Sequence, residues 1–312
     1  MAARKIIIDT DPGQDDAVAI LLALASPELE VAAITAVAGN VPLALTSANA
    51  RKICDLAGRR SMVVAAGAAA PLSRALVTAE YVHGATGLDG PDLPDPVTPL
   101  DPRDGVDVIL DILRAAGPGE VTLCALGPLT NIALALRKAG PAKAAIREIV
   151  AMGGGLFEGG NTTPVAEFNI YVDPEAAAEV FAAGLPVTLV PLDLTHSCLT
   201  TGARVAAIRA LGTPVAGVVA DLIGFFERFD EGKYSTDGAP LHDPNVIAWL
   251  LAPELYGGRQ INVEVETQSQ LTAGMTVADW WGVTDRPANV MYLKDVDADG
   301  FFALLTERLG RL

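Results

Sequence analysis

The feature that most constrains the fold is a regular alternation of short apolar segments and helix-like segments over about the first 200 residues. The first apolar segment, KIIID at residues 5–9, is rich in β-branched residues, and the helix-like stretch after it ends before Pro27. The same criteria predict helices at 41–58, 105–117, 129–140 and 173–184, and strands at 30–39, 62–67, 120–127, 146–155 and 185–195. This alternation predicts the α/β class, with a doubly wound, mainly parallel sheet flanked by helices.

The remainder of the chain changes in character without a linker. Longer helices are predicted at about 203–230 and 244–252, followed by a strand at 260–267 and a C-terminal helix. We find no internal repeat and no low-complexity tract, so we expect one domain over residues 1–312. Hydrophobic residues make up 51% of the chain and aromatic residues only 5%, so Ala, Val, Leu and Ile must form the core, as suits a sheet covered by helices.

Charge and cysteine content narrow the class of protein. The chain has 38 acidic and 22 basic residues, a net charge of −16, and no Lys/Arg-rich stripe, so we expect no nucleic-acid partner. No apolar run reaches the roughly 18 residues of a membrane span, so we expect no membrane partner. Cys54, Cys124 and Cys198 stand far apart, which indicates reduced, buried thiols. The N-terminus enters a strand directly, and we expect a cytoplasmic protein.

Polar residues collect at the predicted ends of the strands. In a doubly wound sheet, ligands bind beyond the carboxyl ends of the strands. The residues at these ends are Asp9, Asp11, Asp15, Asp16, Gly39, Asn40, Leu126, Gly127, Met152 with Gly153–Gly155, and Asp193. The sequence therefore predicts a ligand site at this edge of the sheet.

The segment DTDPGQDD places four aspartates within eight positions, at residues 9–16. Helix capping by Asp15 or Asp16 would explain one or two of them but not four. The D-x-D pattern of haloacid-dehalogenase-type phosphotransferases fits Asp9 and Asp11, although an acidic pair then follows too soon. An EF-hand fits poorly, because Gly13 and Gln14 occupy the wrong positions. A hard-cation site accounts for the whole cluster, since Ca²⁺ is bound by several carboxylate and carbonyl oxygens.

Two later segments provide further polar groups. His242-Asp243-Pro244 precedes a predicted helix, where Asp243 could be an ordinary N-cap and His242 a structural residue. Glu167 and Asn169 are two positions apart and share one side of the backbone if this segment is extended. That arrangement suits a ligand rich in hydroxyl groups, and a solvated loop is the alternative.

Taken together, the motifs resemble those of the inosine–uridine-preferring nucleoside hydrolase family. The resemblance begins with DTDPGQDDAVAI and continues in order over nearly the whole chain, through TAVAGN, VHGATG, LGPLTNIALAL, MGGG, AEFNIYVDPEAA, LDLTH, HDP and GMTVADW. It implies a mainly parallel α/β fold, hydrolysis of the N-glycosidic bond of ribonucleosides, a bound calcium ion and assembly into homodimers or homotetramers.

The resemblance also implies roles for individual residues. The metal ligands correspond to Asp11, Asp15, Asp16, Asp243 and the backbone carbonyl of Leu126. Asp11 corresponds to the general base, and His242 corresponds to the acid that protonates the leaving base in purine-handling members. The residues that correspond to substrate contacts are Asn40, His83, Met152, Asn161, Glu167, Phe168 and Asn169. Asp9 is expected to hold the loop in place without touching the ion.

This set of residues suits the chemistry. Cleavage of a ribosyl C–N bond develops positive charge on the sugar and negative charge on the departing base, so carboxylates near the sugar and an acid near the base both lower the barrier. The sequence does not determine whether a purine or a pyrimidine base is preferred. Loops at about 75–90 and 225–241, including Phe229 and Tyr234, are candidates for base contacts. The rival functions are a phosphatase, a DNA glycosylase, which the charge disfavours, and a non-catalytic nucleoside- or ribose-binding protein.

Overall fold

The computed structural model describes residues 3–234 and 237–312, and describes no side chain in the range 229–236. The described chain forms a nine-stranded sheet with the order β4-β3-β2-β1-β5-β6-β7-β11-β8 and a two-stranded sheet of β9 and β10. Every pairing in the large sheet is parallel except that of β8 with β11. The strands are β1 (Arg4–Thr10), β2 (Leu29–Ala36), β3 (Val64–Ala66), β4 (Leu100–Asp101), β5 (Val121–Ala125), β6 (Ile146–Met152), β7 (Val187–Val190), β8 (Tyr256–Ile261), β9 (Val263–Val265), β10 (Thr276–Ala278) and β11 (Val290–Val296). The predicted α/β fold class is confirmed.

The order of the strands reverses direction beside β1. The chain proceeds from β1 through β2 and β3 to β4 on one side, then crosses back to β5 and continues through β6 and β7 on the other. Both β2 and β5 pair directly with β1. This reversal is the topological switch point of a doubly wound sheet, where the two adjacent loops part and leave a crevice. The loops after β1, β2, β5 and β6 therefore meet at one place.

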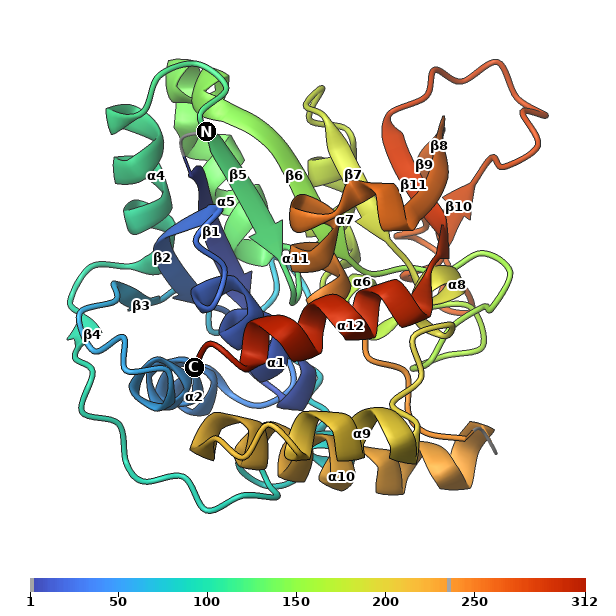
Figure 1. Cartoon of the computed structure of the whole chain (residues 1–312). Helices are drawn as coiled ribbons and strands as arrows, with labels where there is room; N and C mark the ends of the chain where they lie inside the picture. Colours follow the sequence, from blue (N-terminus) through green and yellow to red (C-terminus); the bar gives the residue numbers. More distant parts are fainter. Residues whose placement is uncertain (1–2, 235–236) are drawn as a thin grey trace.

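Helices cover both faces of the sheet (Figure 1). They are α1 (Gln14–Leu24), α2 (Leu43–Leu56), α3 (Glu80–His83), α4 (Gly105–Ala115), α5 (Thr130–Ala139), α6 (Phe168–Val172), α7 (Pro174–Phe181), α8 (Leu192–Thr195), α9 (Gly202–Arg209), α10 (Pro214–Tyr234), α11 (Pro244–Leu251) and α12 (Ala298–Leu309), with 3₁₀ turns at Gly140–Ala145 and Pro253–Leu255. Helices α1, α2, α11 and α12 form one layer, with α9 and α10 outside it, and α4, α5 and α7 form the other.

Alternate residues of β1 enter the two cores. Ile6 and Ile8 pack with the α1 layer, and Ile7 between them packs with the α4 and α5 layer. All three side chains are fully buried. This explains why the middle of the strand, residues 6–8, is apolar without alternation: it is covered on both faces and has no solvent side.

Several predicted boundaries are wrong for local reasons. The helix expected at 203–230 is two helices, α9 and α10, because the chain turns at Gly212, whose φ is +71°, a conformation that favours glycine. The strand expected at 185–195 stops at Val190, since Pro191 follows and α8 begins. The strand expected at 260–267 is divided between β8 and β9. The segment around Glu167 is not extended, because Glu167 is the N-cap of α6.

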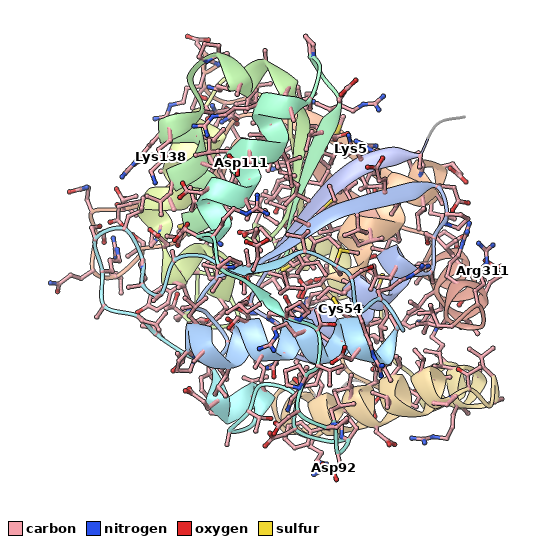
Figure 2. All side chains as sticks on the ribbon, turned by 90° about the vertical axis from the view of Figure 1, so that its left-hand side faces the viewer. Lys5, Cys54, Asp92, Asp111, Lys138 and Arg311 are labelled. Carbon is pink, nitrogen blue, oxygen red and sulfur yellow. The ribbon has the colours of Figure 1, made fainter. Side chains whose placement is uncertain are left out.

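The three cysteines are buried and free, as expected. Cys54 on α2 is buried, whereas the charged residues Asp111, Lys138 and Arg311, also labelled in Figure 2, are exposed. Within the described ranges, no helix has the length and apolarity needed to cross a membrane.

Candidate active site

A pocket opens at the switch point, with about 680 Å³ of space within it and at its mouth. The sequence-predicted residues that line it are Asp15, Asp16, Asn40, His83, Leu126, Met152, Asn161, Glu167, Phe168, Asn169, His242 and Asp243. They come from seven separate loops and helix starts between residues 15 and 243, and the fold brings them together.

An acidic cluster forms the floor of the pocket. Carboxylate oxygens of Asp15, Asp16 and Asp243 lie within 4.8 Å of one another, and all three residues are buried. Burial, followed by repulsion from Asp16, raises the pKa of Asp15 to about 7. Burial and the neighbouring aspartates raise the pKa of Asp243 well above its ordinary value. Carboxyl groups that lie this close together and are this well shielded from water must be protonated or neutralised by a cation.

The start of α1 holds Asp16 in place. The N-cap residue is Gly13, and its backbone N–H donates to Asp16 Oδ2 at 2.9 Å, while the Thr10 hydroxyl donates to Asp16 Oδ1. Asp16 therefore sits at the third helical position and reaches back to the cap. The simple expectation that Asp15 or Asp16 is itself the N-cap residue is wrong.

Asp243 occupies the N-cap position of α11 but does not act as a cap. Its backbone has helical dihedral angles, and within the described part of the chain its side chain accepts no capping hydrogen bond. Pro244 follows in the first helical position. The carboxylate instead faces Asp15 and Asp16 across the pocket, because α11 packs against α1. Capping thus fails to explain this aspartate, and membership of the acidic cluster explains it.

Asp11 adjoins the acidic floor, although it is not among the residues that line the pocket. Its Oδ2 accepts the backbone N–H of Asn40 at 2.7 Å. Its carboxylate fits between two glycines, since a Cβ on Gly39 would lie 2.0 Å from Oδ2 and a Cβ on Gly127 would lie 2.2 Å from Oδ1. Burial and repulsion from Asp16 raise the pKa of Asp11 well above its ordinary value, so the carboxyl belongs electrostatically to the same cluster.

The donor set of this floor fits a hard divalent cation. It consists of the carboxylate oxygens of three aspartates, and Leu126 lines the same pocket. The Leu126 carbonyl accepts a hydrogen bond from Asn169 Nδ2 at 2.7 Å, and a carbonyl oxygen has two lone pairs. A divalent cation among these oxygens would favour the ionised carboxylates that burial alone opposes.

Asp9 acts as a structural link, as expected. Its Oδ1 accepts hydrogen bonds from the Thr35 hydroxyl and from Asn131 Nδ2, which ties β1 to β2 and α5. Asp193 is also structural, although we expected it at the ligand edge. It accepts the backbone N–H groups of residues 156–158 and the hydroxyl of Tyr292, and so holds the loop after β6.

One wall of the pocket carries Glu167 and Asn169, as predicted. Glu167 caps α6 and accepts backbone N–H groups of Gly154, Asn169 and Ile170. Burial raises its pKa to about 7, because the loss of water outweighs these hydrogen bonds. Asn169 Nδ2 donates to the carbonyls of Leu126 and Met152. Since carbonyls only accept, this orients Asn169 Oδ1 away from them, as a possible acceptor for a ligand hydroxyl.

Further polar and apolar groups complete this region. Asn40 Nδ2 donates to Asp16 Oδ2 at 3.3 Å and to the Asp11 carbonyl at 3.0 Å, so it joins the first two loops. Asn161 Oδ1 accepts the backbone N–H of Phe168 at 2.9 Å, which places Asn161 over the start of α6. Phe168 packs with the α3 segment and closes the wall.

Three rings, those of His83, Phe226 and His242, also line the pocket, and we call this group the aromatic end. Phe226 of α10 stacks on His83, with ring centroids 5.8 Å apart, and meets His242 edge-on at 6.4 Å. His242 Nδ1 lies 2.7 Å from the Thr195 hydroxyl. Burial lowers the pKa of His83 to about 4, so this ring is neutral at neutral pH. This end can hold a flat ring between apolar faces and imidazole nitrogens.

Sequence reasoning missed several residues of the pocket. They are Ala79, Tyr81, Val82, Thr162, His196 and Phe226. Four of them lie within 75–90 and 225–241, the loops predicted to contact the base. His196 is the last residue of the LDLTH motif, and this motif could have indicated it. The candidates Phe229 and Tyr234 lie outside the described side chains.

Fold and pocket together define an enzyme site at the switch point of a doubly wound sheet, with an acidic floor and an aromatic end. The family profile described as inosine-uridine preferring nucleoside hydrolase matches residues 6–303. The chain belongs to this family, and is a ribonucleoside hydrolase that acts on N-glycosyl compounds.

Particular relatives support this assignment. A protein of Schizosaccharomyces pombe described as uncharacterized is 53% identical, and the match covers 99% of each chain. The pyrimidine-specific ribonucleoside hydrolase RihA of Photobacterium profundum is 49% identical, again over 99% of each chain. Among solved structures, a purine-preferring ribonucleoside hydrolase from Gardnerella vaginalis superimposes with a TM-score of 0.91 at 32% identity, over 98% of each chain.

Proposed function

We propose that this enzyme hydrolyses pyrimidine ribonucleosides in a calcium-dependent reaction, with Asp11 as general base and His242 as leaving-group acid. The observation that carries the proposal is that one pocket is lined by both a buried acidic floor and two histidines that contact Phe226. The nucleoside would place its ribose over the floor and its base between the aromatic groups.

The cation would be held by the carboxylates of Asp11, Asp15, Asp16 and Asp243 and the carbonyl of Leu126. When bound, calcium supplies positive charge that keeps these carboxylates ionised and orients neighbouring sugar hydroxyls. An all-oxygen donor set favours calcium or magnesium over zinc, which prefers nitrogen and sulfur ligands.

The protein groups divide the remaining work. Asp11, fixed by the Asn40 backbone N–H, accepts a proton from the attacking water. Glu167, Asn161 and Asn169 bind ribose hydroxyl groups, with Asn40, Met152 and Phe168 around the sugar. His242, held through Nδ1 by Thr195, donates a proton to the departing base.

The pyrimidine preference rests on relatedness. The relative named as pyrimidine-specific is 49% identical, whereas the solved enzyme named as purine-preferring is 32% identical. Hydrolysis of inosine at a rate similar to that of uridine would contradict this part of the proposal.

A reducing-sugar assay tests the proposal as a whole. We expect ribose release from uridine and cytidine, loss of activity with a chelator, and recovery with added calcium. Full activity after chelation would remove the cation from the mechanism. Binding of uridine without ribose release would favour the non-catalytic alternative, and phosphate release from phosphate esters would favour the phosphatase.

Three further expectations belong to the same proposal. We propose that residues 1–312 form a single domain, that the enzyme is a homodimer or homotetramer, and that it acts in the cytoplasm. Light scattering coupled to size-exclusion chromatography tests the assembly, and cell fractionation tests the location.

A further inference from the structure

Gln14 is buried beside the acidic floor, but its side chain faces the segment 80–89. Its Nε2 donates to the carbonyl of His83 at 3.0 Å and to the carbonyl of Asp89 at 3.1 Å. Carbonyl oxygens only accept hydrogen bonds, so the opposite orientation of the amide would place three acceptors together. The orientation of Gln14 is therefore fixed, with Oε1 on the side of the His83 ring.

This orientation determines the protonation of His83. Gln14 Oε1 lies 2.7 Å from His83 Nδ1. Because an amide oxygen only accepts, Nδ1 must carry the hydrogen. Burial makes the ring neutral, and a neutral imidazole has one donor and one acceptor nitrogen. Nε2 of His83 therefore has a lone pair and no hydrogen.

The other edge of the His83 ring faces the pocket. His83 lines the pocket and Gln14, with 1% exposure, does not, so the edge away from Gln14 is the one that a ligand meets. The stacked Phe226 ring restricts rotation of the imidazole. The acceptor nitrogen is thus held in a defined place at the aromatic end.

We propose that Gln14 is a positioning residue that fixes His83 as the Nδ1–H tautomer, so that His83 Nε2 accepts a hydrogen bond from an N–H or O–H group of the bound nucleoside. This inference rests on the proposed function for the nature of the ligand. It assigns the two histidines opposite tasks, since a neutral acceptor cannot protonate a leaving group, and that task remains with His242. A ligand that lacks the donor would leave a buried acceptor unpaired, which weakens its binding.

The tautomer is measured first, by ¹⁵N NMR of the calcium-loaded enzyme without nucleoside. The chain has three histidines, so a His83→Ala spectrum assigns the His83 signals. We expect hydrogen on Nδ1 in the wild type, and a shift toward the Nε2–H form in Gln14→Met. A wild-type ring with hydrogen on Nε2 would overturn the proposal. The wild-type spectrum alone shows which nitrogen of His83 carries the hydrogen, so the test remains valid even if Gln14→Met fails to fold.

A double-mutant cycle with uridine then tests the link to binding. We expect Gln14→Met to raise KM about tenfold with a smaller change in kcat, as for the loss of one buried hydrogen bond. In the His83→Ala background the same change should raise KM less than about twofold. Gln270→Met, at an exposed turn, is the matched control and should leave KM unchanged.

Each outcome of the cycle has one meaning. An equal rise of KM in both backgrounds would show that Gln14 only supports the segment 80–89, and would overturn the proposal. Absence of uridine hydrolysis by the wild type would count against the proposed function alone, because the tautomer measurement needs no turnover.

Discussion

Substitution of Gly127 by alanine should remove activity through Asp11 without disturbing the rest of the fold. An added Cβ would lie 2.2 Å from Asp11 Oδ1, where real contacts are essentially never below 3.0 Å, so the carboxylate must move by about 1 Å. A misplacement of about 1 Å at a catalytic group can cost about a hundredfold in rate. We therefore expect kcat for uridine to fall about a hundredfold in Gly127→Ala.

The assay is ribose release at saturating uridine and calcium, with circular dichroism to confirm folding. Gly217→Ala is the matched control, because Gly217 lies in α10 with nothing within 4 Å of the added methyl group. It should keep full activity, since alanine suits a helix better than glycine. If Gly127→Ala acts through Asp11, adding it to the Asp11→Asn variant should lower kcat by less than about threefold. A Gly127→Ala enzyme within threefold of the wild-type kcat would refute the placement of Asp11.

Further predictions address the two proton-transfer groups and the acidic floor. Asp11→Asn should lower kcat for uridine at least about a hundredfold while KM changes less, and steady-state rates near the wild-type level would exclude the role of general base. His242→Ala should lower kcat about a hundredfold with inosine and less with uridine, and rates near the wild-type level with both substrates would exclude the role of leaving-group acid. The chelated protein should lose thermal stability as pH rises from 5 to 8. Burial raises the pKa values of Asp15 and Glu167 to about 7 in the folded state, so the protonated forms stabilise the fold at low pH and this contribution is lost as pH rises through 7. Scanning fluorimetry with and without calcium tests this, and a melting temperature that rises with pH in the chelated protein would show the opposite sign.

The layout of the sheet could be predicted because it depends on local patterns. The middle of β1, residues 6–8, is covered on both faces and is apolar without alternation, and polar residues follow it at the strand end, so the strand is visible in the sequence. Once the strand ends are known, the rule for doubly wound sheets places Asp11, Asn40 and Met152 at one edge.

Other parts of the site depend on contacts between distant segments and could not be predicted from local patterns. Asp243 before Pro244 looks like a helix cap, and only the packing of α11 against α1 turns it toward Asp15 and Asp16. Phe226 has the pattern of an ordinary core residue on α10, and its position between two histidines follows from how that helix packs. Glu167 and Asn169 would share one side of an extended segment, but Asn169 lies in α6, which the Glu167 carboxylate caps, so both reach the pocket by helix geometry.

The acidic floor is assembled from segments that leave the ribosome far apart in time. Residues 11–16 emerge first, and on their own these aspartates remain hydrated, so their repulsion costs little. Asp243 is the last contributor, more than two hundred residues later, and its arrival with α11 encloses the whole group. The electrostatic penalty therefore arises only when Asp243 joins Asp15 and Asp16, and from that point the enclosed carboxyl groups need a cation or protons.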